Sequence, residues 1–495
     1  MSYRLSRRVF LSAVAAFSST PVWANAPLTS LRPMLRGQGF HKRAIAGPEQ
    51  IIEAAKLGGR VTFAVANAQT GALLESESGT SGTPPASVTK AVTALYALDA
   101  LGPGHRFTTQ VIATGGVSGG VVQGDLVLVG GADPTLDSNH LAALAGQLKA
   151  AGIREVRGKF RIYDGALPRV DHIDAGQPDH VGYNPAISGI SLNFNRVHFE
   201  WRRGSNGYGV TMDARTNKYR PEVAMSRMRV AERDIPVYTF KATPTRDEWT
   251  VSRRALGKGG SRWLPVRLPG LYAGDVFRTM ARTNGIALAT GELTSRAPKG
   301  TVVAQIQSAP LQDILRDMLR FSNNLIAEMV GLAATVKRSG KTNSLRSSAS
   351  EMNRWAGANL GMKSVKLVDH SGLGDASRMS ATEMCGALVK VRQAGFRGML
   401  KPIAMRDAKG RVQKTHPLKV HAKTGTLNFV SALAGYMTVP DGTELAFAIF
   451  AADEKTRSRI KKANREAPQG ARGWNKRAKT MQQRLIERWG SLYNS

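Results

Sequence analysis

Hydrophobic residues follow two different periods along the chain, and each change of period marks a change of structure. Short apolar runs at 61–65 and 73–75 flank Gln69-Thr70-Gly71, which predicts two strands joined by a tight turn. From Ala86 onward, apolar residues recur every three or four positions until Gly102. That spacing predicts a helix that begins near Ala86, directly after two prolines.

Residues 105–299 have the period of strands. Short apolar runs such as 111–114, 126–129 and 197–201 are separated by glycines and polar turns. The segment is therefore predicted to be β-rich, and its inner part, about 198–262, is expected to form a small domain of its own.

Helical spacing returns at Leu311. One apolar stripe runs to Met329, and two further helices are expected at about 348–360 and 381–393. Strands follow again on both sides of Asp441-Gly442, which is a strong hairpin signal.

These elements predict a mixed α and β fold, in which strands from the beginning and the end of the chain form one sheet with helices packed against it. Residues 27–104 and 300–495 would build this domain, and residues 105–299 would be inserted into it as one or two extra domains. Apolar residues at 481, 485, 486 and 489 share one face of a terminal helix with a basic outer side. A docked helix is expected there, with a membrane-surface helix as the alternative.

The first 26 residues have the features of an export signal. A basic segment with the pair Arg7-Arg8 leads into a short apolar run, and small residues at Ala24 and Ala26 suggest cleavage after one of them. The arginine pair indicates the twin-arginine route, with a general secretory signal as the alternative. A periplasmic location is therefore expected.

The formal net charge is +33, so the chain attracts polyanions. Export excludes nucleic acid as the expected partner and favours peripheral contact with an anionic membrane or wall surface. Cys385 is the single cysteine, which excludes a disulfide framework, and it is expected to be a buried apolar side chain. The nine histidines lack the spacing of zinc ligands, and no phosphate-binding loop is present, so neither a metal nor a cofactor is expected.

Three short motifs occur in order along the chain: Ser87-Val88-Thr89-Lys90, Ser322-Asn323-Asn324 and Lys423-Thr424-Gly425. Each alone is weak, because about two Ser-x-x-Lys matches are expected by chance in a chain of this length. Ser458-Arg459-Ile460-Lys461 is such a match, and Ser191-Leu192-Asn193 is a second Ser-x-Asn match. Ser458 lies downstream of Lys423 in a highly charged stretch, whereas Ser87 begins an apolar helix. Order and helical setting favour Ser322 over Ser191.

The spacing of the first motif suits a serine nucleophile. Positions i and i+3 share one helix face, so the Lys90 amine can reach the Ser87 hydroxyl and remove its proton if burial lowers the pKa of the lysine. Backbone N–H groups of Ser87 and Thr426 could stabilise an oxyanion. Lys423 offers a positive charge to a substrate that ends in a carboxylate.

At these motifs the sequence resembles the three-domain (class C type) low-molecular-mass penicillin-binding proteins, which are D-alanyl-D-alanine carboxypeptidases and endopeptidases. These proteins have a large insertion between the first two motifs, as expected here. Further similarity lies in Pro85-Ala86-Ser87, in the run from Gly124 to Leu136, and in Asp369-His370-Ser371-Gly372-Leu373.

The resemblance implies a serine β-lactamase/transpeptidase-like domain and a role for each motif residue. Ser87 would be the nucleophile, Lys90 the general base, and Ser322 the relay that passes a proton to the leaving amine. Asn324 would hold the substrate backbone, and Lys423 with Thr424 would bind the terminal carboxylate. The implied partners are the peptidoglycan stem peptide and β-lactam inhibitors.

The sequence departs from the family pattern at two points. His370 stands where a glycine is expected, and Gly374-Asp375-Ala376 lengthens the stretch before Arg378. His370 is interpreted as a structural turn residue. A β-lactamase-like or esterase hydrolase and a non-enzymatic wall-binding scaffold are the alternatives to the peptidase, although the intact motifs argue against the scaffold.

Overall fold

The computed structural model describes residues 45–407 and 409–494, so the predicted export signal at 1–26 lies outside the described part. Residues Pro48–Ser495 form one compact unit. Within the described residues, none of the helices combines the length and hydropathy needed to cross a bilayer.

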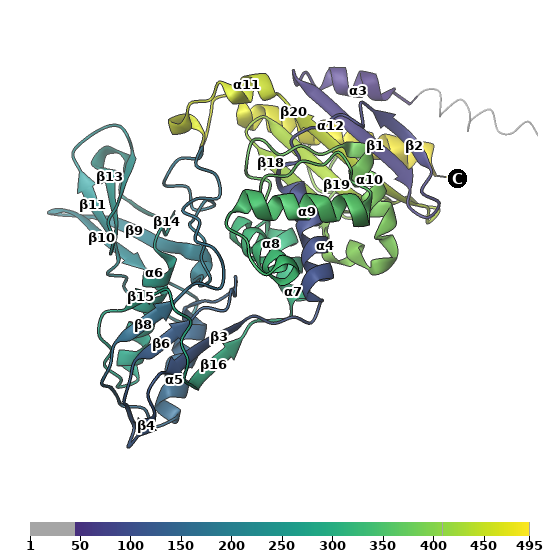
Figure 1. The fold of residues 1–495 in the computed structure, drawn as a ribbon. Coiled ribbons are helices and arrows are strands. Elements are labelled where there is room, and N and C mark those ends of the chain that lie inside the picture. Colours follow the sequence, from purple (N-terminus) through teal and green to yellow (C-terminus); the bar gives the residue numbers. More distant parts are fainter. Residues whose placement is uncertain (1–44, 408, 495) are drawn as a thin grey trace, which may run out of the picture. The chain divides into compact units, whose positions relative to one another are not determined.

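The central sheet joins the two ends of this unit, as the sequence predicts (Figure 1). Its strand order is β17-β18-β19-β20-β1-β2, and all neighbouring pairs are antiparallel. The strands are β1 (Arg60–Asn67), β2 (Leu73–Glu77), β17 (Lys401–Ile403), β18 (Lys419–Leu427), β19 (Val430–Thr438) and β20 (Glu444–Ala452).

Side-chain alternation along these strands divides the core into two layers. On β20, Ala446, Ala448 and Phe450 pack with the helices of one face, whereas the intervening large side chains pack with the helices of the other face. The first face carries α4 (Thr89–Leu101), α7 (Leu311–Phe321), α8 (Asn324–Ser339), α9 (Leu345–Leu360) and α10 (Ala381–Lys390). The second face carries α3 (Pro48–Ala54) and α12 (Ala471–Leu492), and α11 (Glu454–Ser458) follows β20.

The terminal helix α12 is docked rather than free. Its apolar face, formed by Met481, Leu485, Ile486 and Trp489, is buried against the sheet. The prediction of a docked helix is confirmed, and this apolar face is not available to lipid.

The helical stripe expected from Leu311 to Met329 is interrupted in the structure. Ser322 adopts a left-handed conformation with φ 58° and ψ 37°, which ends α7. Asn323 then caps α8 by accepting a hydrogen bond from the Ile326 N–H at 3.1 Å. A continuous helix was therefore the wrong expectation at the second motif, because a stripe of apolar residues carries no signal of a single reversed residue.

The inserted region has its own sheets and its own core, as expected for a β-rich segment (Figure 1). Its largest sheet has the order β15-β8-β6-β3-β16, and α5 (Ser138–Ala150) and α6 (Pro269–Thr283) share its core. The strands of this sheet are β3 (Thr108–Ala113), β6 (Leu126–Val129), β8 (Phe160–Tyr163), β15 (Glu292–Thr294) and β16 (Thr301–Gln307).

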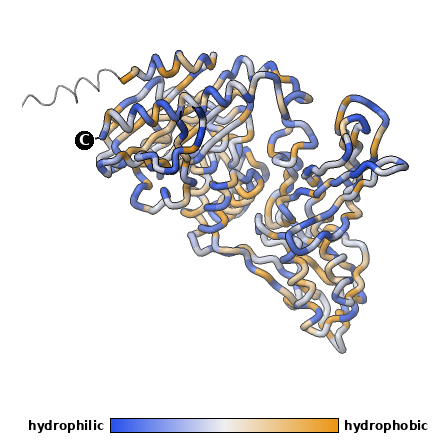
Figure 2. Tube along the Cα trace, turned by 180° about the vertical axis from the view of Figure 1, so that it is seen from behind, coloured by the Kyte–Doolittle hydropathy of each residue, from blue (hydrophilic) through white to orange (hydrophobic). Residues whose placement is uncertain are grey.

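Three smaller sheets complete the inserted region, and Figure 2 shows hydrophobic and hydrophilic positions mixed along its chain. The first contains β9 (Arg196–Gly204), β10 (Gly207–Asp213) and β14 (Gly259–Pro265), and the second contains β11 (Ser226–Ala231), β12 (Tyr238–Ala242) and β13 (Asp247–Ser252). The third contains β4 (Val117–Ser118), β5 (Val121–Val122) and β7 (Glu155–Val156).

Candidate active site

Ser87 lies on a short 3-10 turn, η1 (Ala86–Val88), that leads directly into α4. The turn packs against strand β18 at Gly425. A Cβ atom at that glycine would lie 2.8 Å from the carbonyl oxygen of Pro85 and 3.0 Å from the backbone nitrogen of Ser87. The absence of a side chain therefore lets the strand of the third motif approach the backbone of the first.

Lys90 is fully buried and donates three hydrogen bonds, one turn after Ser87. Its Nζ lies 2.9 Å from Ser87 Oγ, 2.8 Å from Asn324 Oδ1 and 2.7 Å from the carbonyl oxygen of Ser371. A neutral lysine amine has two hydrogens and one lone pair. Because the amide and the carbonyl can only accept, they hold the two hydrogens and direct the lone pair at the Ser87 hydroxyl.

Burial lowers the pKa of Lys90 from 10.5 to about 8. Glu328 and Asp369 oppose the shift, because their negative charges favour the protonated amine. The outcome is a lysine that is partly neutral near physiological pH, which is the property that a general base requires.

Ser322 and Lys423 form a second pair. Lys423 Nζ donates to Ser322 Oγ at 2.9 Å and to the carbonyl oxygen of Thr424 at 2.7 Å. The pKa of Lys423 is lowered well below its ordinary value, first by burial and then by the charges of Lys90 and Lys401. The left-handed backbone at Ser322 turns the chain between α7 and α8, where its hydroxyl meets this amine.

Like that of Thr424, the side chain of Thr426 forms no hydrogen bond with the other predicted site residues. Thr426 follows Gly425 on β18 and its side chain is exposed. Its predicted contribution is a backbone N–H, and the close packing of Gly425 against the Ser87 turn places that part of the strand beside the nucleophile.

Asn324 connects the site to the inserted region, which sequence reasoning did not anticipate. Its Nδ2 donates to the carbonyl oxygen of Tyr183 at 3.0 Å, from a loop of the insertion. Arg267, which is buried, holds the same loop by donating to the carbonyl oxygens of Asp171, Asn184 and Asp179 at 2.9, 2.7 and 2.9 Å. No motif marks these residues, because their role depends on a contact between distant segments.

Comparison with known families decides the classification. The model of the D-Ala-D-Ala carboxypeptidase 3 (S13) family matches residues 48–469, which include all three motifs. The chain belongs to this family. It is accordingly a hydrolase of the serine peptidase type, and the resemblance to three-domain penicillin-binding proteins is confirmed.

Two curated relatives of the S13 enzyme are similar over most of their length. A D-alanyl-D-alanine carboxypeptidase of Actinomadura sp. (strain R39) is 28% identical over 469 residues, covering 86% of this chain and 86% of the relative. A D-alanyl-D-alanine carboxypeptidase of Haemophilus influenzae is 23% identical over 440 residues, and the match covers 79% of this chain and 85% of the relative.

Solved structures agree on the fold. The crystal structure of penicillin binding protein 4 from Haemophilus influenzae superposes with a TM-score of 0.73 at 19% identity, covering 91% of this chain and 100% of that one. A second structure of that protein, in complex with a β-lactam, gives a TM-score of 0.68 at 20% identity and covers 82% of this chain and 93% of that one. The predicted fold class, a transpeptidase-like domain with a large insertion, is confirmed.

The two other motif matches lie on different elements from the predicted site residues. Ser191 is fully buried in the inserted region, on the segment that leads into β9. Ser458 lies at the end of α11, where its hydroxyl donates to the carbonyl oxygen of Lys455 at 3.0 Å. Neither hydroxyl forms a hydrogen bond with a lysine amine, whereas the Ser87 hydroxyl does.

His370 is buried in the structure, and its interpretation as a structural residue stays a prediction. Its ring is fully buried, and its Nε2 lies 2.7 Å from Ser348 Oγ, beside Gly331 of α8. Burial lowers the pKa of His370 to about 3, so the imidazole is neutral at physiological pH. Burial also raises the pKa of the Cys385 thiol to about 12, which makes it unreactive.

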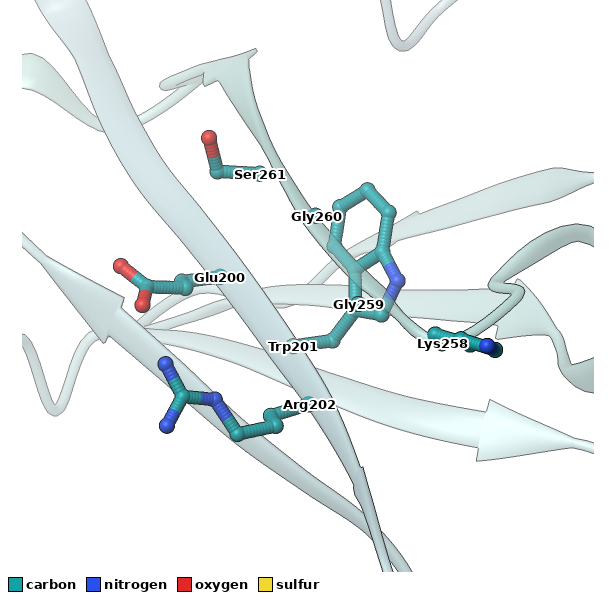
Figure 3. A pocket seen from close by; sticks show the side chains of 7 residues that line it. All are labelled: Glu200, Trp201, Arg202, Lys258, Gly259, Gly260 and Ser261. Carbon is teal, nitrogen blue, oxygen red and sulfur yellow. The ribbon is translucent and has the colours of Figure 1, made fainter.

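The hollows outside the motifs hold none of the predicted catalytic residues. Figure 3 shows the side chains that line one of them on strands β9 and β14, namely Glu200, Trp201, Arg202 and residues 258–261. Its volume is about 450 Å³. Glu200 is already paired with Arg215 at 2.7 Å. Among the described residues, no group of three or more histidine, cysteine, aspartate or glutamate side chains is arranged to hold a metal ion.

Proposed function

We propose that this enzyme removes the terminal D-alanine from peptidoglycan stem peptides through an acyl-enzyme on Ser87. The observation that carries the proposal is the hydrogen bond between Lys90 and Ser87, with the other two amine hydrogens of Lys90 held by fixed acceptors. A lysine held in this way is oriented to take a proton from one hydroxyl only.

The reaction begins when Lys90 removes the Ser87 proton and Oγ attacks the carbonyl carbon of the penultimate D-alanine. Backbone N–H groups of Ser87 and Thr426 stabilise the oxyanion. The C–N bond then breaks, the proton that Lys90 removed passes through Ser322 to the leaving amine, and an ester remains on Ser87. Water hydrolyses the ester and restores the hydroxyl.

The remaining motif residues bind the peptide. Lys423 and Thr424 receive its terminal carboxylate, and carboxylate binding favours the protonated form of this buried amine. Asn324 uses one Nδ2 hydrogen for the Tyr183 carbonyl, so the second hydrogen is free for a substrate backbone carbonyl.

Fluorescent penicillin tests the nucleophile. A β-lactam should acylate Ser87 and remain attached, so the purified mature protein should be labelled and Ser87→Ala should not. Ser458→Ala is the matched control, because Ser458 heads the chance Ser-x-x-Lys match, and it should be labelled like wild type. Absence of labelling in folded wild-type protein would refute the proposal.

Carboxypeptidase and endopeptidase activities differ only in what leaves with the amine. Mass spectrometry separates the two activities. A carboxypeptidase releases free D-alanine from a stem pentapeptide, whereas an endopeptidase splits a cross-linked dimer without releasing free D-alanine. A β-lactamase-like enzyme would instead turn over nitrocefin rapidly. Glu328 does not favour that alternative, because both of its carboxylate oxygens already accept backbone hydrogen bonds.

We also infer that the protein is exported to the periplasm by the twin-arginine route. The supporting feature is the Arg7-Arg8 pair ahead of a short apolar run. Replacing both arginines with lysine should retain the protein in the cytoplasm, which cell fractionation measures. Unchanged export would point to the general secretory route.

We propose peripheral contact of the basic surface with an anionic membrane or wall. The outer side of α12 exposes several cationic side chains, namely Arg472, Lys476, Lys479 and Arg484. Co-sedimentation with phosphatidylglycerol vesicles and with purified wall polymer, each at low and high salt, distinguishes the two surfaces. Failure to bind either one at low salt would refute the contact.

For the domains, we propose a signal at 1–26, a catalytic domain at 27–104 and 300–495, and an insertion at 105–299 with an inner domain at about 198–262. Sheets of strands β9 to β14 support the inner domain. Strand β16 pairs with β3, which supports extending the insertion to Gln307. Limited proteolysis should cut preferentially near these boundaries.

A further inference from the structure

A buried carboxylate lies beneath the general base. Glu328 is one helical turn after Asn324 on α8 and is completely buried. Its Oε2 accepts the His370 N–H at 3.0 Å and its Oε1 accepts the Ser371 N–H at 2.9 Å. One carboxylate therefore holds two successive peptide units of the loop that supplies Ser371.

The same loop reaches Lys90 through its backbone. The Ser371 carbonyl oxygen accepts a hydrogen bond from Lys90, and Thr93 on α4 donates to the His370 carbonyl oxygen at 2.7 Å. At Gly372, with φ 76°, a Cβ atom would lie 1.8 Å from the Ala86 carbonyl oxygen. The loop thus packs directly against the turn that carries the nucleophile, and a small displacement would change the acceptor offered to Lys90.

We propose that Glu328 is a positioning residue for the reaction: by binding the N–H groups of His370 and Ser371, it fixes the carbonyl that orients the Lys90 amine toward Ser87. The inference rests on the proposed function, because it assigns Lys90 the part of the base. Glu328 itself does not touch substrate.

The charge of Glu328 acts on the same amine. Four groups surround Lys90 from the elements packed on it: Glu328 from α8, Asp369 and the neutral His370 from the loop, and Lys423 from β18. The two carboxylates raise the pKa of Lys90, whereas burial lowers it. Burial and then the charge of Asp369 raise the pKa of Glu328 to about 8, and the two N–H donors and Lys90 oppose that shift.

Glu328→Gln tests the inference because the glutamine side chain has nearly the same shape as the glutamate side chain. An amide offers one acceptor oxygen, so one of the two loop N–H groups loses its partner, and the negative charge is removed. The measured quantity is the rate constant of acylation by a chromogenic β-lactam against pH in full-length mature protein. The plateau at high pH should fall about 10- to 100-fold, and the affinity of the complex before acylation should stay constant.

Glu383→Gln is the matched control. Glu383 also holds a backbone N–H, that of Ser364 at 2.8 Å, together with the Ser364 hydroxyl at 2.9 Å, but it lies outside the active site. Its plateau and the midpoint of its pH profile should equal those of wild type. The inference is overturned if folded Glu328→Gln keeps the wild-type plateau or loses no more than Glu383→Gln does.

Thr93→Val provides a second test if Glu328→Gln does not fold. It removes the hydroxyl that holds the same loop from α4 without changing any charge, so the plateau should fall while the midpoint stays in place. An unchanged plateau in that variant would overturn the inference. Wild-type protein that is never acylated would instead refute the proposed function, so the two failures are distinguishable.

Discussion

The pH dependence of acylation follows from the environment of Lys90. A pKa of about 8 leaves about 10% of the amine neutral at pH 7 and about 1% at pH 6, whereas an ordinary lysine would be neutral in only about 0.03% of molecules at pH 7. Burial therefore raises the amount of competent base about 300-fold at pH 7. If Lys90 is the base, the acylation rate constant should rise about tenfold per pH unit below 8 and level off above it.

Stopped-flow measurement with a chromogenic cephalosporin between pH 5.5 and 9.5 checks this profile. His370 does not contribute to the limb, because its pKa of about 3 lies below the whole range. Lys90→Met should abolish acylation at every pH and serves as the control for reaction with other groups. A rate that is flat across this range, or that keeps rising with a midpoint above pH 10, would refute the assignment of Lys90 as a desolvated base.

Three further substitutions test the packing around the site. Gly425→Ala places a Cβ atom 3.0 Å from the Ser87 nitrogen, so penicillin labelling should slow on the order of 100-fold while the circular dichroism spectrum is retained; normal labelling would show that the strand can move. Trp489→Ala opens a cavity under the sheet and should lower the free energy of unfolding by about 3–5 kcal/mol in urea titration, with little loss if the helix merely rests on the surface. His370→Ala should cost about 3 kcal/mol in the same titration but keep Ser87 reactive, whereas loss of labelling in folded protein would give the imidazole a direct part in the reaction.

The sequence predicts the side chains that carry the chemistry of the site better than the contacts that hold those side chains in position. Ser87 and Lys90 could be paired because side chains three positions apart lie on one face of a helix. In the structure, Lys90 Nζ lies 2.9 Å from the Ser87 hydroxyl oxygen. The docked face of α12 was predictable for the same reason, since it depends on local periodicity.

The strands at the two ends of the chain could be placed in one sheet, but the individual contacts that support the site from distant segments could not be predicted. Tyr183 meets Asn324 through its backbone carbonyl, which every residue type possesses, so no residue pattern marks the contact. Glu328 reads as one polar position on an apolar helix, and only the fold brings the backbone of residues 370 and 371 to it. The reversed backbone of Ser322 is hidden in the same way, because the apolar stripe continues on both sides of it.

The pairing of β1 with β20 determines when this molecule can acquire its site during synthesis. Strand β1 is made almost first, yet its partner on one side spans Glu444–Ala452, close to the end of the chain. The inserted region, whose first and last strands β3 and β16 are themselves paired, can fold as a unit while the ribosome is still producing the remainder. Any product that stops before β20 therefore carries Ser87 on an uncompleted sheet, and we expect such a chain to lack activity even when it already contains all three motifs.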